Sequence, residues 1–180
     1  MIIWLNGTFG AGKTTTSLEL TALLPESRVF DTEHVGFMLR HVRDLVDGDF
    51  QHAKPWRGLV VATATQLLDH FGGTLVVPQT VLVRQYWREI HDGLTAAGIP
   101  VHHFVLHTDR DTLVHRIDTD TKPESAPAKQ WRHDHLTPYE EALPWLREEA
   151  EVIDTTDVPA DRVARRIAAT VETAGRPAVG

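Results

Sequence analysis

The chain has 180 residues and no cysteine, which excludes disulfides, thiolate metal sites and cysteine nucleophiles. Its formal net charge of −7 argues against a nucleic-acid binder, because affinity for a phosphate backbone comes from clustered Lys and Arg. No apolar run approaches the roughly 20 residues that span a bilayer, so we expect a cytoplasmic protein without an integral membrane segment.

The first predicted element is the apolar run IIWLN at 2–6, which we interpret as a buried strand because no basic signal-peptide region precedes it. A helix is predicted at 13–24, and residues 32–71 are predicted to be mostly helical, with breaks around 47–49 and at Pro55. Further strands are expected at 28–31, 74–79, 100–107 and 151–155. Further helices are expected at 56–71, 84–97, 109–117, 137–149 and 159–174.

Strands and helices alternate along the whole chain, and several strands are apolar on both faces. This pattern is typical of a parallel sheet that is covered by helices on both sides. We therefore predict a three-layer α/β fold in a single domain at 1–174, followed by a disordered tail at 175–180.

The stretch NGTFGAGKTTT, at 6–16, contains the pattern G-x-x-x-x-G-K-[ST] of a phosphate-binding (Walker A) loop, between a strand and a helix as that loop requires. Its glycines allow several backbone N–H groups to converge on one anion, and the helix N-terminus adds to this attraction. Lys13 can reach the outer phosphates, and the Thr14 hydroxyl can bind Mg²⁺. The sequence therefore predicts a site for ATP and Mg²⁺. The loop residues expected to bind this cofactor are Gly7, Phe9, Gly10, Ala11, Gly12, Lys13, Thr14 and Thr15.

The second predicted strand ends at Asp31. Ligands collect at the carboxyl ends of the strands in an open parallel sheet, so Asp31 is expected near the phosphate loop. Its carboxylate could accept a proton from a substrate hydroxyl or hold a metal-bound water; the alternative is that it caps the helix that begins at Thr32. The third strand ends without the usual Walker B acid, which favours a small-molecule kinase over a GTPase switch or a motor ATPase.

Five stretches carry a family resemblance: MIIWLNGTFGAGKT at the start, DTEHVGFMLR at 31–40, PWR at 55–57, LVVPQT at 75–80 and VHHFVL at 101–106. With them the chain resembles the tunicamycin-resistance family of P-loop kinases, within the group of nucleoside-monophosphate, shikimate and gluconate kinases. The resemblance implies a sheet order of 2-3-1-4-5, ATP binding, and phosphoryl transfer to a hydroxyl of a small molecule. It also implies a nucleoside antibiotic such as tunicamycin as the acceptor, with antibiotic resistance as the result.

The resemblance further implies a mobile lid at about 117–135, which includes a polar, proline-containing segment at 118–129 that we predict to be an exposed loop. Arg116 matches the lid arginine that lies against the adenine and the phosphates; a surface arginine is the alternative. Further basic residues of the lid could close over the transferred phosphoryl group, namely Lys122, Lys129 and Arg132. The residues expected to be catalytic are Lys13, Asp31, Arg116 and Arg132, with Thr14 and Asp31 as ligands of Mg²⁺.

The substrate side is expected at about 32–60 and at the end of the third strand. Arg40, Trp56 and Arg57 offer cationic and stacking contacts, and Gln79 and Thr80 offer hydrogen bonds to hydroxyl groups. Packing in the core is the alternative for Trp56, and a surface ion pair with Asp44 is the alternative for Arg40. The residues expected to bind the substrate are Asp31, Arg40, Trp56, Arg57, Gln79 and Thr80.

Two other functions stay open at this point. One is a housekeeping kinase for a nucleotide, a sugar or a shikimate-like acid. The other is an ATP-binding protein that sequesters a drug without modifying it. The sequence also leaves a homodimer open.

Overall fold

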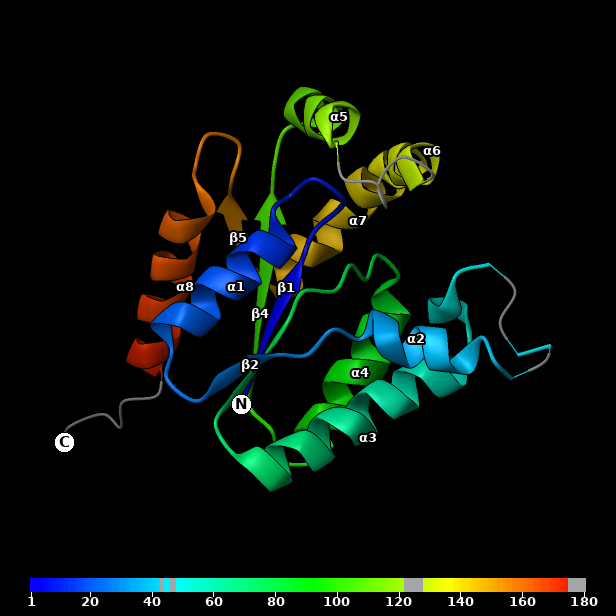
Figure 1. Cartoon of the computed structure of the whole chain (residues 1–180), viewed down its shortest axis with the longest axis vertical. Coiled ribbons are helices and arrows are strands. Elements are labelled where there is room, and N and C mark those ends of the chain that lie inside the picture. The colour runs from blue at the N-terminus through cyan, green and yellow to red at the C-terminus, as the bar shows by residue number, and fades with distance from the viewer. Residues whose placement is uncertain (43, 46–47, 122–127, 175–180) are drawn as a thin grey trace.

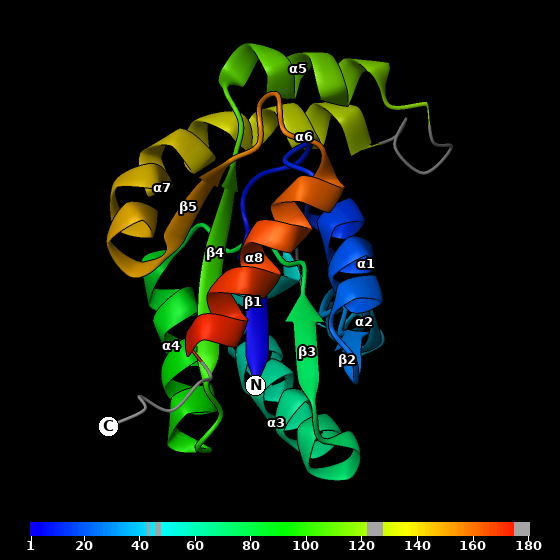
Figure 2. The same cartoon turned by 90° about the vertical axis from the view of Figure 1, so that its left-hand side faces the viewer.

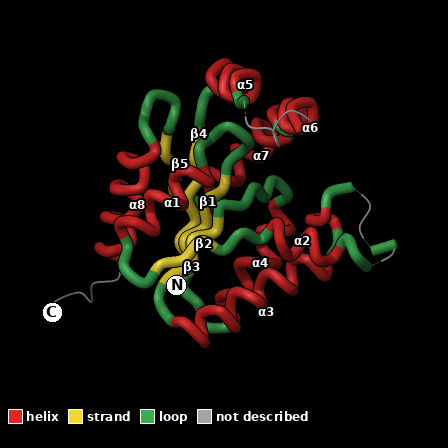
Figure 3. The backbone as a smooth tube through the Cα atoms, viewed as in Figure 1, coloured by secondary structure: helices red, strands yellow, loops and turns green. Residues whose placement is uncertain are grey.

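Five parallel strands form one sheet at the centre of the molecule (Figures 1 and 3). The computed structural model describes residues 1–42, 44–45, 48–121 and 128–174. The strand order is β2-β3-β1-β4-β5, which confirms both the three-layer α/β fold and the expected order. The strands are β1 (Ile2–Asn6), β2 (Ser27–Val29), β3 (Thr74–Val77), β4 (Val101–His107) and β5 (Glu151–Asp154).

Helices cover both faces of this sheet (Figure 1). On one side α1 packs against α8, and on the other side α3 packs against α4. The helices are α1 (Lys13–Leu23), α2 (Glu33–Leu39), α3 (Lys54–Phe71), α4 (Arg84–Ala96), α5 (Arg110–Thr119), α6 (Lys129–Asp134), α7 (Leu136–Glu149) and α8 (Ala160–Ala174), and a 3-10 turn, η1, spans Phe50–His52.

The central strand β1 divides its side chains between the two layers, because successive residues of a strand point to opposite faces. Ile3 and Leu5 join a core cluster with residues of α1 and α8. Ile2 and Trp4 join a second cluster with residues of α3 and α4. All four side chains are fully buried, and burial of each contributes about 1.5–3 kcal/mol, so β1 is held rigidly at the centre.

The predicted break around Pro55 occurs at Ala53, whose backbone is extended. Pro55 itself lies in the first turn of α3, where the missing N–H of proline costs no hydrogen bond. Helix α6 forms inside the lid segment, partly where a loop was predicted.

At α5 the cap is Asp109, whose carboxylate accepts a hydrogen bond from the Thr112 N–H (2.9 Å). The predicted disordered tail at 175–180 lies outside the described residues.

The carboxyl ends of the strands point toward α5 and α6 (Figure 2). The connections after β1, β3, β4 and β5 therefore meet at this edge of the sheet, and they supply most of the site described below. No helix in the described ranges has both the length and the apolar character needed to cross a membrane.

Candidate functional site

The loop between β1 and α1, residues 7–12, folds around its glycines. Gly7 has a φ of +127°, and a Cβ on it would lie 2.5 Å from the Leu106 carbonyl oxygen. Gly12, with a φ of +91°, precedes the first residue of α1. Within the described part of the chain, the N–H groups of Gly10 and Gly12 donate no hydrogen bond. These free donors beside a helix N-terminus form a place that fits an anion such as phosphate.

Asn6 ties the start of this loop to the segment that follows β3. Its Oδ1 accepts hydrogen bonds from the N–H groups of Gly7 (2.8 Å) and Val81 (2.9 Å), and its Nδ2 donates to the Val81 carbonyl (2.9 Å). The Thr80 hydroxyl donates to the Gly7 carbonyl (2.7 Å). All these side chains are buried, so the loop is anchored before any ligand binds. Sequence reasoning missed Asn6, because the motif begins one residue later.

Lys13 lies folded back over the loop. Its Nζ donates to the carbonyl oxygens of Gly7 and Thr8, both at 2.9 Å. Burial lowers the pKa of Lys13 to about 8, while the Glu33 carboxylate raises it and the Arg132 guanidinium lowers it. An anion bound in the loop would therefore stabilise the charged form of Lys13, which burial disfavours.

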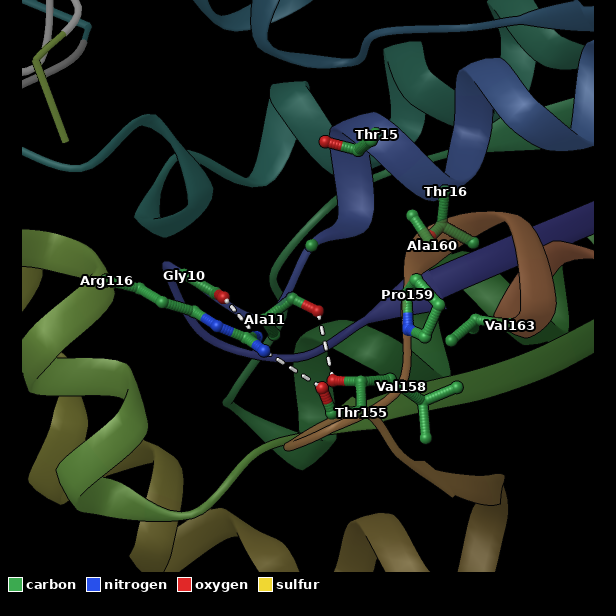
Figure 4. A pocket seen from close by; sticks show the side chains of 11 residues that line it. Gly10, Ala11, Thr15, Thr16, Arg116, Thr155, Val158, Pro159, Ala160 and Val163 are labelled. Atoms are coloured by element: carbon green, nitrogen blue, oxygen red, sulfur yellow. Dashed lines mark hydrogen bonds between the residues drawn. The ribbon is translucent and has the colours of Figure 1, made fainter. Parts of the chain in front are cut away.

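A cavity of about 310 Å³ opens beside the loop (Figure 4). One end is polar and contains the loop backbone and Arg116; the other is formed by Val158 and Pro159 from the connection between β5 and α8. Thr15 lines the cavity, and the neighbouring Thr14 is exposed at the start of α1. The cavity therefore suits a flat apolar group that is joined to an anion.

Arg116 reaches from α5 across this cavity (Figure 4). Its guanidinium donates to the carbonyl oxygens of Gly10 (3.1 Å), Thr155 (3.0 Å) and Thr156 (2.8 Å). The side chain therefore lies at the phosphate loop and joins that loop to the segment after β5. No sequence pattern indicated the residues after β5.

Asp31 follows β2 and lies next to Glu33. Its Oδ1 accepts a hydrogen bond from the Glu33 N–H (2.9 Å), and its side chain remains 45% exposed. Burial raises the pKa of Glu33, and the charges of Asp31 and Asp49 raise it further, whereas Lys13 lowers it. The structure thus brings the Glu33 carboxyl group into the electrostatic neighbourhood of the loop lysine, with Asp31 and Asp49 acting on Glu33.

A second cavity of about 340 Å³ is lined by none of the residues that line the first one. Its lining comes from the segment before α3, the segment after β3, α4, α6 and α7. Thr80 joins this cavity to the loop, because the same hydroxyl that donates to Gly7 belongs to its wall. The side chains that matter below are Asp49, His52, Thr80, Tyr86, Trp131 and His135.

Phe9, in the phosphate loop, connects this loop with α6 through contacts between aromatic rings. Its ring centroid lies 4.6 Å from that of Trp131 and 5.4 Å from that of His135. Lys13 Nζ lies 5.4 Å from the Phe9 centroid and the Arg132 guanidinium lies 5.9 Å from it. Sequence reasoning missed Trp131 and His135 as wall residues, because no local pattern relates α6 to a loop more than 120 positions earlier.

Three of the predicted substrate residues lie behind the cavity wall. Trp56 is fully buried, and its indole donates to the Thr32 carbonyl (3.1 Å). Arg57 is also buried and donates to the Glu89 carboxylate (2.6 Å). The buried Gln79 side chain accepts a hydrogen bond from the Thr32 hydroxyl (2.7 Å).

The other predicted residues of the substrate side and the lid have different places. Thr80 lines the second cavity, whereas Arg40 is exposed, with its guanidinium 5.7 Å from the Phe37 centroid. Arg132 donates to the Asp120 carboxylate (2.9 Å). Lys129 donates to the Asp118 carbonyl (2.7 Å), and Lys122 lies outside the described residues.

Comparisons with known proteins agree with this geometry. A family model described as an AAA domain matches residues 2–136. The tunicamycin resistance protein of Deinococcus radiodurans is 30% identical to this chain, with a TM-score of 0.75 over 95% of both chains. No protein with a curated description matches the chain.

Two further solved structures share the fold. The Mycobacterium tuberculosis APS kinase, in complex with AMPPNP and APS, is 21% identical with a TM-score of 0.63, over 95% of this chain and 96% of that chain. The shikimate kinase from Acinetobacter baumannii, in complex with shikimate, is 18% identical with a TM-score of 0.62, over 98% of this chain and 95% of that chain.

Proposed function

The chain belongs to the tunicamycin-resistance family of P-loop kinases, and on this premise we propose that it transfers the γ-phosphoryl group of ATP to a hydroxyl of a small molecule. A nucleoside-type antibiotic such as tunicamycin is the proposed acceptor, which the name of the Deinococcus radiodurans relative supports. Resistance would then follow from phosphorylation of the drug. We place this activity in the cytoplasm, where a chain without cysteine needs no oxidising compartment.

One observation carries the proposal: the phosphate loop lines one cavity and is hydrogen-bonded to the wall of a second. Gly10 and Gly12 line the first, together with Arg116. Thr80, which is hydrogen-bonded to Gly7, lines the second. A transferase needs separate places for the donor and the acceptor next to the transferred group, and two cavities that meet the same loop support this function.

On the donor side, the free N–H groups of Gly10 and Gly12 bind phosphate oxygens. Lys13 exchanges its two carbonyl partners for phosphate oxygens. The Thr14 hydroxyl, and Asp31 through water, would hold Mg²⁺, which would supply charge neutralisation at the phosphates. Arg116 extends along the backbone of the phosphate loop, and its guanidinium holds the nucleotide in the first cavity.

On the acceptor side, Asp31 accepts the proton of the attacking hydroxyl or orients a metal-bound water. Its half-exposed carboxylate at the end of β2 has room for either role. Arg132, on α6 beside Phe9, lies close enough to Lys13 to lower the pKa of that lysine. Arg116 and Arg132 therefore approach the loop from α5 and α6 and stabilise the negative charge that spreads over the transferred group.

The test is mass spectrometry of tunicamycin and other nucleoside antibiotics after incubation with the protein and MgATP. The expected result is a drug that gains the mass of one phosphoryl group, with ADP as the second product. Lys13→Ala is the control: it should abolish ATP binding and turnover, because the loop loses its only ammonium. Near-normal turnover by that variant would refute the phosphate-loop assignment.

Two other outcomes would change the proposed acceptor or the proposed reaction. Tight drug binding with an unchanged drug mass would indicate a protein that sequesters the drug. Transfer to a nucleotide, a sugar or a shikimate-like acid, found by a screen with labelled ATP, would indicate a housekeeping kinase.

A further inference from the structure

The described wall of the second cavity, defined above by Thr80 and its neighbours, carries aromatic, histidine and acidic side chains. Among the described residues that line it there is no lysine and no arginine. An acceptor with a phosphate or a carboxylate group needs such a residue, because burial of an unpaired anion costs several kcal/mol. The wall therefore lacks the usual means of binding an anionic acceptor.

Two described arginines beside wall residues already have anionic partners. Arg57 donates to the Glu89 carboxylate at 2.6 Å and to the Gln51 carbonyl at 2.5 Å. Its guanidinium lies 4.1 Å from the centroid of the Tyr86 ring, and Tyr86 rather than Arg57 belongs to the wall. Arg132 pairs with Asp120 at 2.9 Å.

The fixed charge on this side of the loop is negative. Asp49 lines the cavity, and its carboxylate accepts the Gln51 N–H (2.9 Å). Asp31 and Asp49 both act on Glu33 strongly enough to raise its pKa, in addition to the larger effect of burial. An anionic group in the cavity would meet the Asp49 carboxylate in the wall.

The remaining wall suits a ring with hydroxyl or N–H donors. Tyr86 and Trp131 offer aromatic faces and edges for stacking. His135 Nδ1 lies 2.6 Å from the Trp131 carbonyl oxygen, which can only accept, so Nδ1 carries the proton. In the neutral imidazole Nε2 is then an acceptor, and the Asp49 carboxylate is a second one.

We propose that this cavity binds an acceptor that is uncharged, contains a planar ring and donates hydrogen bonds, and that it rejects acceptors with a phosphate or carboxylate group. This inference rests on the proposed function, which places the acceptor in this cavity. It names the substrate class of that site and excludes nucleotides and shikimate-like acids as its ligands.

The test is a binding comparison of matched pairs that differ by one anionic group: uridine with uridine monophosphate, and adenosine with adenosine monophosphate. Affinity is measured by NMR or calorimetry, with the first cavity filled by an ATP analogue that cannot transfer its phosphoryl group. The neutral member of each pair should bind about tenfold more tightly or better. Val83→Trp, which places a larger side chain at an exposed wall position, should abolish the binding of the neutral member.

Asp49→Asn tests the cause of the discrimination. The asparagine side chain can still accept the Gln51 N–H, so the fold is kept, but one negative charge is lost. The preference for the neutral member should fall about fivefold. Asp92→Asn, the same change on α4 outside this cavity, should leave the preference unchanged.

Equal or tighter binding of the charged members would overturn the inference, and so would a lack of binding by both neutral members. Tight binding of a neutral member that survives Val83→Trp would also overturn it, because the ligand would then lie elsewhere. Selective binding of a neutral member without transfer from ATP would support the inference and refute the proposed kinase activity.

Discussion

Asp31 can act as a base or as a turn residue. The observed hydrogen bond from the Glu33 N–H to its carboxylate accounts only for the role in the turn. Asp31→Asn keeps an oxygen for that bond but cannot accept a proton. Transfer should fall by about 10²-fold or more, the scale of a positioned base, with ATP affinity retained. Single-turnover transfer and nucleotide titration measure the two quantities.

A matched control exists at the end of another strand. The Asp154 Oδ1 accepts the Thr156 N–H at 2.9 Å, which repeats the turn geometry of Asp31. Asp154→Asn should leave the transfer rate nearly unchanged. If both variants transfer at the wild-type rate, Asp31 is only a turn residue.

The lowered pKa of Lys13 predicts the pH dependence of nucleotide binding. With a pKa of about 8 in the free protein, Lys13 is charged below pH 8 and becomes neutral above it. The dissociation constant for ATP should therefore rise as the pH increases through 8, by up to about tenfold per pH unit. Isothermal titration between pH 7 and pH 9.5 measures this change, roughly the range over which the group titrates.

Lys13→Arg is the control for this assignment, because a guanidinium stays charged over the whole range. Any binding that it retains should lose the pH dependence near 8. The same shift predicts that the free energy of unfolding increases with pH between about 8 and the ordinary lysine value of 10.5, since the unfolded chain binds more protons there. An unchanged dissociation constant across pH 8 would contradict the burial of this amine.

At the scale of elements, the turn from β1 into α1 depends on Gly7. Its positive φ and the 2.5 Å approach to the Leu106 carbonyl leave no room for a side chain. Gly7→Ala should lower the free energy of unfolding by about 1–3 kcal/mol and reduce ATP affinity, because the loop must shift. Denaturant unfolding and nucleotide titration provide the measurements.

Gly58 gives the opposite prediction within α3. A Cβ there meets nothing within 4 Å, and the residue lies inside a helix. Gly58→Ala should raise the free energy of unfolding by up to about 1 kcal/mol without changing ATP affinity. If Gly7→Ala and Gly58→Ala changed the free energy of unfolding and the ATP affinity in the same way, the geometry of the loop at Gly7 would not be the cause of these changes.

Helix α6 shows where local sequence stopped being informative. Six residues are too few to form a stable helix alone, and the loop predicted at 118–129 meets α6 only at its first residue, with no element predicted for the rest. The helix is held by contacts across the molecule, above all that between Trp131 and Phe9. Pro55 shows the same limit: only the boundary of α3 shows whether a proline breaks a helix or begins one.

For the molecule as a whole, nucleotide binding should stabilise the fold, because the first cavity is lined by the β1–α1 loop, α1, α5, the β5–α8 connection and α8. At an ATP concentration 100 times the dissociation constant the gain is about 2.7 kcal/mol. For a chain of this size that raises the melting temperature by roughly 5–10 °C. Scanning calorimetry with and without MgATP measures the shift, and Lys13→Ala should lose it.

The amino-acid sequence by itself determined the alternating elements, the parallel three-layer fold, the phosphate loop and the acid after β2. These features depend on local periodicity and on a contiguous motif, which short-range sterics and burial control. The tertiary structure alone decided that Trp56 and Arg57 lie behind the wall, that Arg116 crosses the first cavity, and that Trp131 and His135 meet Phe9. The reason is physical: a cavity wall assembled from segments 49–52, 80–86 and 131–138 exists only after the sheet has brought distant loops to one edge.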